Sequence, residues 1–158
     1  MPIIELLTSI NAARELCFDL TRDIELHIRS TQGTGELAVS GVTTGLMKLG
    51  EEVTWEATHF GVRQKLTSRI TRYDRPGHFR DSQVRGAFHR FDHDHFFTVE
   101  SDGTMMRDVF DYESPFGLLG RLADRWFLRS YMTKLLKNRA LVIKAAAEAR
   151  TGALPRML

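Results

Sequence analysis

Three histidines on one predicted strand, and one aspartate on the next, have the types and spacing that proton chemistry requires. Residues 88–99 read FHRFDHDHFFTV, so His89, His93 and His95 occupy alternate positions, and Asp108 follows on the next segment. Alternate side chains of a strand share a face, so the three histidines lie on one side of a sheet. That side carries no formal charge when the histidines are neutral, and we assign it to the interior.

The turn between these two segments supports the assignment. Asp102-Gly103 is typical of a two-residue hairpin loop. This loop would pair Ser101 with Thr104, Val99 with Met106, Phe97 with Asp108, His95 with Phe110 and His93 with Tyr112. The inward residues of the second strand are then Met106, Asp108, Phe110 and Tyr112, which are mostly apolar. Asp108 would lie diagonally next to His95.

An inward carboxylate is costly unless it is hydrogen-bonded, so we expect Asp108 to contact at least one of His59, His93 and His95. In one interpretation Asp108 fixes a histidine tautomer and orders the wall of the interior. In the other, histidine and aspartate form a general acid/base pair. The candidate catalytic residues are therefore His59, His93, His95 and Asp108.

A metal site is the third interpretation of the same histidines. His89 and His93 would be ~13 Å apart along a strand, too far to share one ion. His93 and His95 would be ~6.6 Å apart and could share an ion only with help from another strand. We therefore expect no metal and no other cofactor.

The elements that position these residues follow from the hydrophobic period. A period of two predicts seven antiparallel strands at Pro2–Ile10, Val42–Leu49, Glu52–Phe60, Val62–Tyr73, His78–Val84, Phe88–Glu100 and Thr104–Glu113. Helical spacing after the N-cap residue Asn11 predicts one helix to about Arg29. Residues 36–40 fit either a second short helix or the start of a strand.

A long amphipathic helix is predicted from Gly117 to about Ala149, with a break near Ser114–Leu122 where proline and glycine gather. Its apolar side would carry Leu118, Leu122, Leu128, Met132, Leu135, Val142 and Ala146. The fold class is therefore α+β, with a curved sheet closed by the terminal helix. We expect one domain over residues 1–150 and a flexible tail over 151–158.

Composition excludes several classes of protein. The 158 residues are 42% hydrophobic and 27% charged, with a net charge of +2, which favours a single folded domain and gives no strong attraction to nucleic acid. The single cysteine, Cys17, excludes an intrachain disulfide. No apolar run is long enough to span a bilayer, and the N-terminus does not resemble a signal peptide, so we expect a cytoplasmic protein.

Three stretches resemble a known superfamily. They are Val53–Gly61 (VTWEATHFG), Gly86-Ala87-Phe88 with His93-Asp94-His95-Phe96, and Pro115-Phe116-Gly117 at the entry to the last helix. With the order of elements, they are similar to the START-related, pollen-allergen-like superfamily, often called SRPBCC, and within it to bacterial members of the polyketide cyclase/dehydrase and lipid-transport type. The resemblance implies a helix-grip fold: a seven-stranded curved antiparallel sheet around a long C-terminal helix, with one or two short helices after the first strand.

The function that we expect from fold and inner face is binding or transport of a hydrophobic small molecule, such as a lipid, a polyketide or an isoprenoid, by a monomer or homodimer. The ligand-binding candidates are Trp55, His59, Phe91, His93, His95, Phe97, Asp108, Phe110, Tyr112, Leu128 and Met132. Two alternatives remain open. The first is a cyclase or dehydratase that uses the His-Asp cluster in the same cavity, and the second is a module that binds a protein partner.

Overall fold

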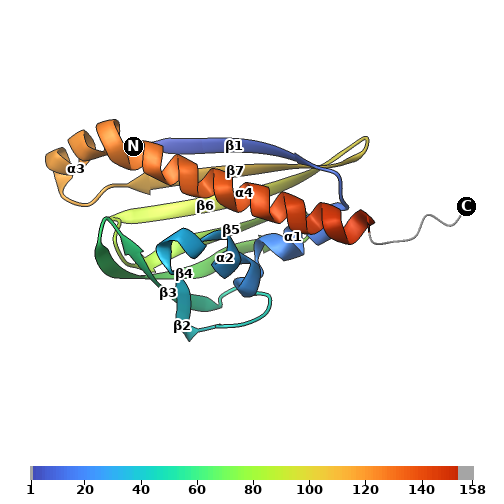
Figure 1. Ribbon diagram of the computed structural model, residues 1–158, viewed down its shortest axis with the longest axis horizontal. Coiled ribbons are helices and arrows are strands. Elements are labelled where there is room, and N and C mark those ends of the chain that lie inside the picture. Colours follow the sequence, from blue (N-terminus) through green and yellow to red (C-terminus); the bar gives the residue numbers. More distant parts are fainter. Residues whose placement is uncertain (1, 153–158) are drawn as a thin grey trace, which may run out of the picture.

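Seven antiparallel strands form one curved sheet in the computed structural model of the chain, which describes residues 2–152 (Figure 1). The strands are β1 (Ile3–Ile10), β2 (Leu37–Gly41), β3 (Glu52–His59), β4 (Val62–Asp74), β5 (His78–Arg85), β6 (Arg90–Glu100) and β7 (Gly103–Glu113). Their order across the sheet is β1-β7-β6-β5-β4-β3-β2, so the first strand pairs with the last. The predicted seven-stranded antiparallel sheet is confirmed.

The helices lie on one face of this sheet. Between β1 and β2 come α1 (Arg14–Thr21), α2 (Ile24–Ser30) and the short 3-10 helix η1 (Gln32–Thr34). After β7 come α3 (Gly117–Ala123), the π-helical turn η2 (Asp124–Leu128) and α4 (Arg129–Gly152). Figure 1 shows α4 laid across the sheet, and α4 packs against β1, α1 and α2. This arrangement confirms the predicted helix-grip architecture.

Two separate apolar clusters pack between the sheet and the helices. The first, which we call the packed core, joins α1 and α2 to the sheet through Phe18, Phe79, Phe97 and Met106. The second contains Ile4, Phe91, Phe110, Tyr112 and Leu136. Along β6 the residues between Phe91 and Phe97 that share their face are His93 and His95, so the polar cluster lies between the two apolar ones.

The helix predicted to run from Asn11 to Arg29 is interrupted. The carboxylate of Asp23 accepts a 2.8 Å hydrogen bond from the backbone N–H of Leu26 and caps α2, which ends α1 before it. The prediction of Asn11 as an N-cap was also wrong, because Ala13 is the N-cap residue of α1 and makes no side-chain cap.

The strand predicted at Val42–Leu49 was wrong, and residues 36–40 contribute to a strand instead. β2 ends at Gly41, which has a φ of 74° and lies so close to β3 that a Cβ would be 2.2 Å from the carbonyl oxygen of Glu52. Only glycine can adopt this φ and also approach the neighbouring strand so closely. The strand ends at this residue. Residues 42–51 form a loop except for an isolated bridge between Asp23 and Leu46.

The β6–β7 hairpin differs from its predicted register by two residues. Its loop is Ser101-Asp102, and Glu100 pairs with Gly103. Phe97 therefore lies opposite Met106, and His95 lies directly opposite Asp108 rather than diagonal to it. A shift of two residues leaves the side chains of β6 on their predicted faces, which is why the inward assignment of His93 and His95 is correct although the register was not. The inward assignment of His89 was wrong, because the strand begins at Arg90 and His89 before it is exposed.

The terminal helix breaks later than predicted and buries a different stripe. The π-helical turn at Asp124–Leu128 is the irregular part, whereas 117–123 is α-helical. The buried residues of α4 are Leu136, Ala140, Ile143 and Ala147, and the predicted inner residues Leu118 and Leu122 are exposed. Of the tail predicted for 151–158, Thr151 and Gly152 belong to α4, and 153–158 lie outside the described residues.

Candidate functional site

A cavity of about 1020 Å³ lies between the sheet and the segment from α3 to α4. Seven of the predicted ligand-binding residues line it: Trp55, His59, Phe91, His93, Phe110, Leu128 and Met132. Most of these side chains are apolar, and β3, β6, β7, η2 and α4 each contribute at least one. Small-molecule sites typically enclose about 300–1,000 Å³, so the space suits a large apolar ligand.

Four predicted ligand-binding residues do not line the cavity, and that part of the prediction is corrected. Phe97 packs edge-to-face on Phe18 in the packed core. Tyr112 is fully buried and donates its hydroxyl hydrogen to the carboxylate of Asp124, which holds the π-helical turn against the sheet. His95 and Asp108 lie behind the cavity wall, because side chains on both sides cover them.

His95 is the centre of a buried ionic network. Its Nδ1 donates to Asp108 Oδ1 over 2.6 Å, and its Nε2 donates to Asp81 Oδ1 over 3.0 Å. His95 has no exposed surface, and Phe79 stacks on its ring at 4.4 Å between centroids. The predicted hydrogen bond from Asp108 to one of the three histidines is therefore confirmed.

The charges of this network follow from its hydrogen bonds. Burial alone would lower the pKa of His95, but the hydrogen bonds to Asp108 and Asp81 raise it. Burial alone would raise the pKa of each carboxyl, but hydrogen bonds and nearby histidines lower the pKa of Asp81 to about 2 and that of Asp108 far below its usual range. An imidazolium thus bridges two carboxylates.

His93 and Asp81 are the members of the cluster that line the cavity. The ring of His93 lies 3.9 Å from that of His95 between centroids, with Nε2 3.5 Å from Asp108 Oδ1 and Nδ1 3.9 Å from Asp81 Oδ1. Burial, and then the charge of His95, lower the pKa of His93 to about 4, so the ring is neutral at pH 7. Its buried Nε2 faces Asp108 and makes no hydrogen bond among the described residues, so the cluster contains one unsatisfied buried group.

Sequence reasoning missed Asp81 and Arg139. Asp81 lies opposite His93 on β5, two residues after the buried Phe79, and the alternation from Phe79 would have placed it inward. Arg139 lies on α4, lines the cavity and donates to the carbonyl oxygen of Thr21 over 2.8 Å. Burial raises the pKa of Asp81, and the charge of Arg139 lowers it in addition to the larger effects of His95 and His93.

Asp81, His93 and His95 form the group of described residues that could hold a metal ion, since each offers a ligand atom within 4.8 Å of the others. However, His95 already donates from both nitrogens, and two carboxylates face one imidazolium and one guanidinium nearby. This network is balanced in charge by its own side chains. We therefore assign the cluster to proton and hydrogen-bond chemistry.

A second polar group lies on the opposite wall. His27 Nε2 and Glu36 Oε1 are 2.6 Å apart, and the ring of His27 stacks on Trp55 at 4.1 Å. His59 Nδ1 shares a 2.8 Å hydrogen bond with the hydroxyl of Tyr131 on α4. His59 therefore joins β3 to the terminal helix and takes no part in the hydrogen bonds of Asp108.

Comparisons with known proteins bear on the fold. No protein-family model matches the chain, and no curated protein matches it. Among solved structures, TTHA0849 from Thermus thermophilus is 20% identical, with a TM-score of 0.72 over 92% of this chain and 99% of its own. Major latex-like protein 151 from Panax ginseng is 16% identical, with a TM-score of 0.66 over 92% and 97%. A START superfamily protein from Mycobacterium smegmatis is 11% identical, with a TM-score of 0.69 over 94% and 98%.

These likenesses define the class of fold. The chain has the START-like and major latex-like helix-grip fold, as the sequence resemblance predicted. At these levels of identity the neighbours establish the architecture, whereas the ligand and any chemistry must be argued from the site itself.

Replacing Asp108 by alanine should destabilise the fold by about 1–3 kcal/mol, because His95 would keep a buried, unpaired N–H donor. Urea denaturation measures this loss. Asp111→Ala is the matched control, since Asp111 lies on the opposite face of β7 in a half-exposed ion pair and should cost at most about 1 kcal/mol. Equal stability of Asp108→Ala and wild type would contradict the network.

Stability should fall as the pH is lowered from 6.5 to about 4, because His93 takes up a proton in the unfolded chain that the folded chain excludes. His95 has the opposite sign: its contribution is complete below pH 6.5 and is lost as pH rises through its raised pKa. Urea midpoints between pH 4 and 6.5 should show a weaker pH dependence for His93→Gln than for wild type. His89→Gln, which removes an exposed histidine, is the control, and an unchanged slope in His93→Gln would contradict the assignment.

Proposed function

We propose that the chain binds a hydrophobic small molecule that carries at least one hydroxyl or carbonyl group. The observation that carries this proposal is the cavity of about 1020 Å³, whose apolar walls include Trp55, Phe91 and Phe110. Water in such a space gains few hydrogen bonds, so an apolar ligand that displaces it is favoured.

The polar part of the ligand is inferred from His93. This neutral ring is a polar group on a largely apolar wall, and Asp81, 3.9 Å from its Nδ1, lines the cavity beside it. A hydroxyl or carbonyl placed there would form a hydrogen bond that a purely aliphatic ligand cannot form. The position of the polar group relative to the apolar body would then give selectivity among lipids, polyketides and isoprenoids.

Filling the cavity from β3 should abolish binding. Ala57 is buried and lines the cavity, and Ala57→Phe should weaken binding of the apolar probe N-phenyl-1-naphthylamine by at least about tenfold through overlap with the probe. Fluorescence titration measures the affinity, and native mass spectrometry of protein from its own host should show a co-purifying compound that this variant lacks.

The neighbouring Thr58 supplies the control. It lies on the same strand with its side chain exposed on the other face, so Thr58→Phe adds the same group outside the cavity. This variant should bind the probe within about twofold of wild type. Equal affinity in Ala57→Phe and Thr58→Phe would contradict a ligand site in this cavity.

A second candidate function is acid/base catalysis on the bound molecule, favoured by the access of His93 to the cavity and by its two carboxylate neighbours. His93 would transfer the proton, while Asp108 and Asp81 would act as positioning residues. Because Asp108 lies behind the wall, it would not touch the substrate.

His93→Gln separates binding from catalysis. It should keep probe affinity within about threefold, since glutamine retains a polar group, but should slow conversion of the co-purifying compound by about 100-fold or more. Mass spectrometry of the compound before and after incubation measures conversion. Conversion by His93→Gln at the wild-type rate, or none by wild type, would leave ligand binding as the function.

A further inference from the structure

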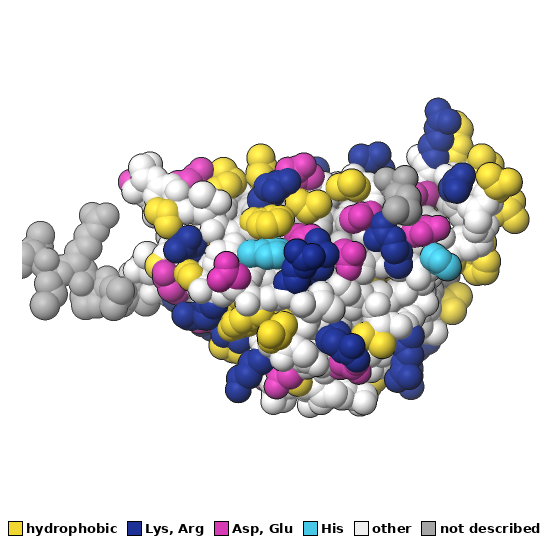
Figure 2. All heavy atoms as spheres, turned by 180° about the vertical axis from the view of Figure 1, so that it is seen from behind, with side chains coloured by type: hydrophobic (Ala, Val, Ile, Leu, Met, Phe, Trp, Pro, Cys, Tyr) yellow, Lys and Arg dark blue, Asp and Glu magenta, His cyan; other side chains and the backbone are white. Residues whose placement is uncertain are grey.

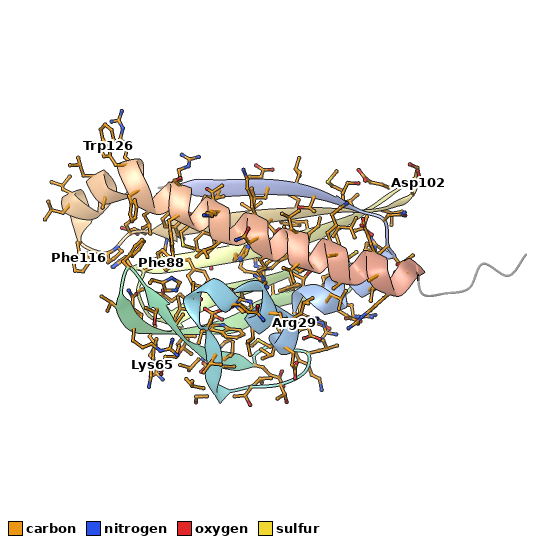
Figure 3. The ribbon with its side chains drawn as sticks, viewed as in Figure 1. Arg29, Lys65, Phe88, Asp102, Phe116 and Trp126 are labelled. Atoms are coloured by element: carbon orange, nitrogen blue, oxygen red, sulfur yellow. The ribbon has the colours of Figure 1, made fainter. Side chains whose placement is uncertain are left out.

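One end of the molecule exposes an unusually large apolar surface. We call it the mouth surface, and it consists of Phe60, Phe116, Leu118, Leu119, Leu122 and Trp126. Phe116 and Trp126 are 84% and 80% exposed, and Figure 3 shows Trp126 pointing away from the body of the protein. Five of the six lie within residues 116–126, and Phe60 contacts Phe127 of the same segment. Single exposed apolar residues are common, but such a group of large ones marks a surface that contacts something apolar.

Backbone strain occurs at the same place. Among the described residues, those other than glycine with a positive φ are Phe60, at 53°, and Phe116, at 73°. A bulky side chain in the left-handed region costs free energy, and at Phe60 this conformation is imposed by the two-residue turn Phe60-Gly61 between β3 and β4. Both strained residues are exposed aromatic side chains and both line the cavity, so they lie where its wall reaches the surface.

A row of positive charge borders the apolar row. Leu118, Leu122 and Trp126 are four residues apart, and so are Arg121, Arg125 and Arg129, which gives two adjacent ridges along the helical segment. The three arginines are exposed. From Gly117 to Ala147 the one acidic residue is Asp124, which is buried against Tyr112. Figure 2 shows basic and apolar side chains together at this end of the molecule.

We propose that the mouth surface docks on the surface of an anionic lipid bilayer. The large apolar side chains would enter the interfacial region, and the arginine ridge would pair with lipid phosphates. Charge complementarity selects this occupant over a second copy of the chain, because a two-fold contact through this face would bring the arginine ridges of both copies together. The docking is peripheral, since no helix within residues 2–152 is long and apolar enough to cross a bilayer.

Docking in this orientation places the opening of the cavity against the lipid. Phe60, Phe116 and Phe127 are the exposed aromatic residues of the cavity lining, and Phe60 contacts Phe127 at 5.0 Å and Tyr131 at 4.6 Å between centroids. These contacts close the cavity from β3 to the terminal helix. Insertion of Phe60 into the interface would separate it from Phe127 and Tyr131. If the proposed function is correct, this gives a lipophilic ligand a route that avoids water.

Co-sedimentation of the full chain with phosphatidylcholine vesicles, with and without phosphatidylglycerol, tests the docking. Wild type should bind the phosphatidylglycerol vesicles. Arg121→Gln with Arg125→Gln should weaken that binding by about fivefold per charge. The control Lys134→Gln with Lys137→Gln removes the same net charge from α4 outside the mouth surface and should bind like wild type.

The apolar contribution has its own pair of variants. Leu118→Ser with Trp126→Ser should reduce vesicle binding by at least about tenfold. Leu141→Ser with Val99→Ser removes two side chains of comparable exposure elsewhere and should have no effect. Ala57→Phe, which fills the cavity, should bind vesicles like wild type, so failure of the ligand proposal and failure of docking are distinguishable.

Three results would overturn the proposal. The first is that wild type binds neither vesicle, and the second is that mouth-surface and control variants bind equally. The third is a dimer in sedimentation velocity that Leu118→Ser with Trp126→Ser converts to monomer, in a protein that does not bind vesicles. That result would assign the mouth surface to a second copy of the chain.

Discussion

The bridge of His95 between Asp108 and Asp81 is the interaction on which the rest of the structure depends. It joins the three neighbouring strands β5, β6 and β7 through side chains that are largely buried from water. It also divides the interior in two: aromatic residues of the packed core lie on one side, and the cavity lies on the other. Because a buried ion is stable only with its partners in place, the network fixes where the dense half ends and the hollow half begins.

The same network sets the chemistry of His93. Burial and the charge of His95 keep His93 neutral, so the cluster presents an uncharged ring to the cavity beside the carboxylate of Asp81. His95 and Asp108 do not line the cavity, whereas Asp81 does, with its charge offset by His95 and Arg139. The site therefore places a small polar group on otherwise largely apolar walls, which suits recognition of a mostly apolar molecule.

The sequence predicted the seven-stranded sheet and the inward face of β6 and β7, because alternation is a local signal that survives a register error of two residues. It did not predict the break at Asp23, the loop after Gly41 or the π-helical turn, which depend on a cap, a close backbone approach and the tertiary contact between Tyr112 and Asp124. For the site, parity placed Asp108 among the histidines but could not show that His95 and Asp108 lie behind the wall. Asp81 was missed because no face was assigned to β5, and Arg139 because the inward side of α4 depends on where the helix breaks.

The two ends of the terminal helical segment differ in which residues they bury. From Leu136 to Ala147, α4 buries small and medium-sized apolar residues against β1, α1 and α2, and this burial stabilises the fold. From Phe116 to Phe127 the segment does the reverse, since its large apolar residues face solvent and the groups it buries include Gly120 and Asp124. The same segment lines the cavity through Phe116, Gly120, Ala123 and Phe127, so the exposed apolar end and the cavity lie side by side. The π-helical turn, held against the sheet by Tyr112, separates this part of the segment from the buried part of α4.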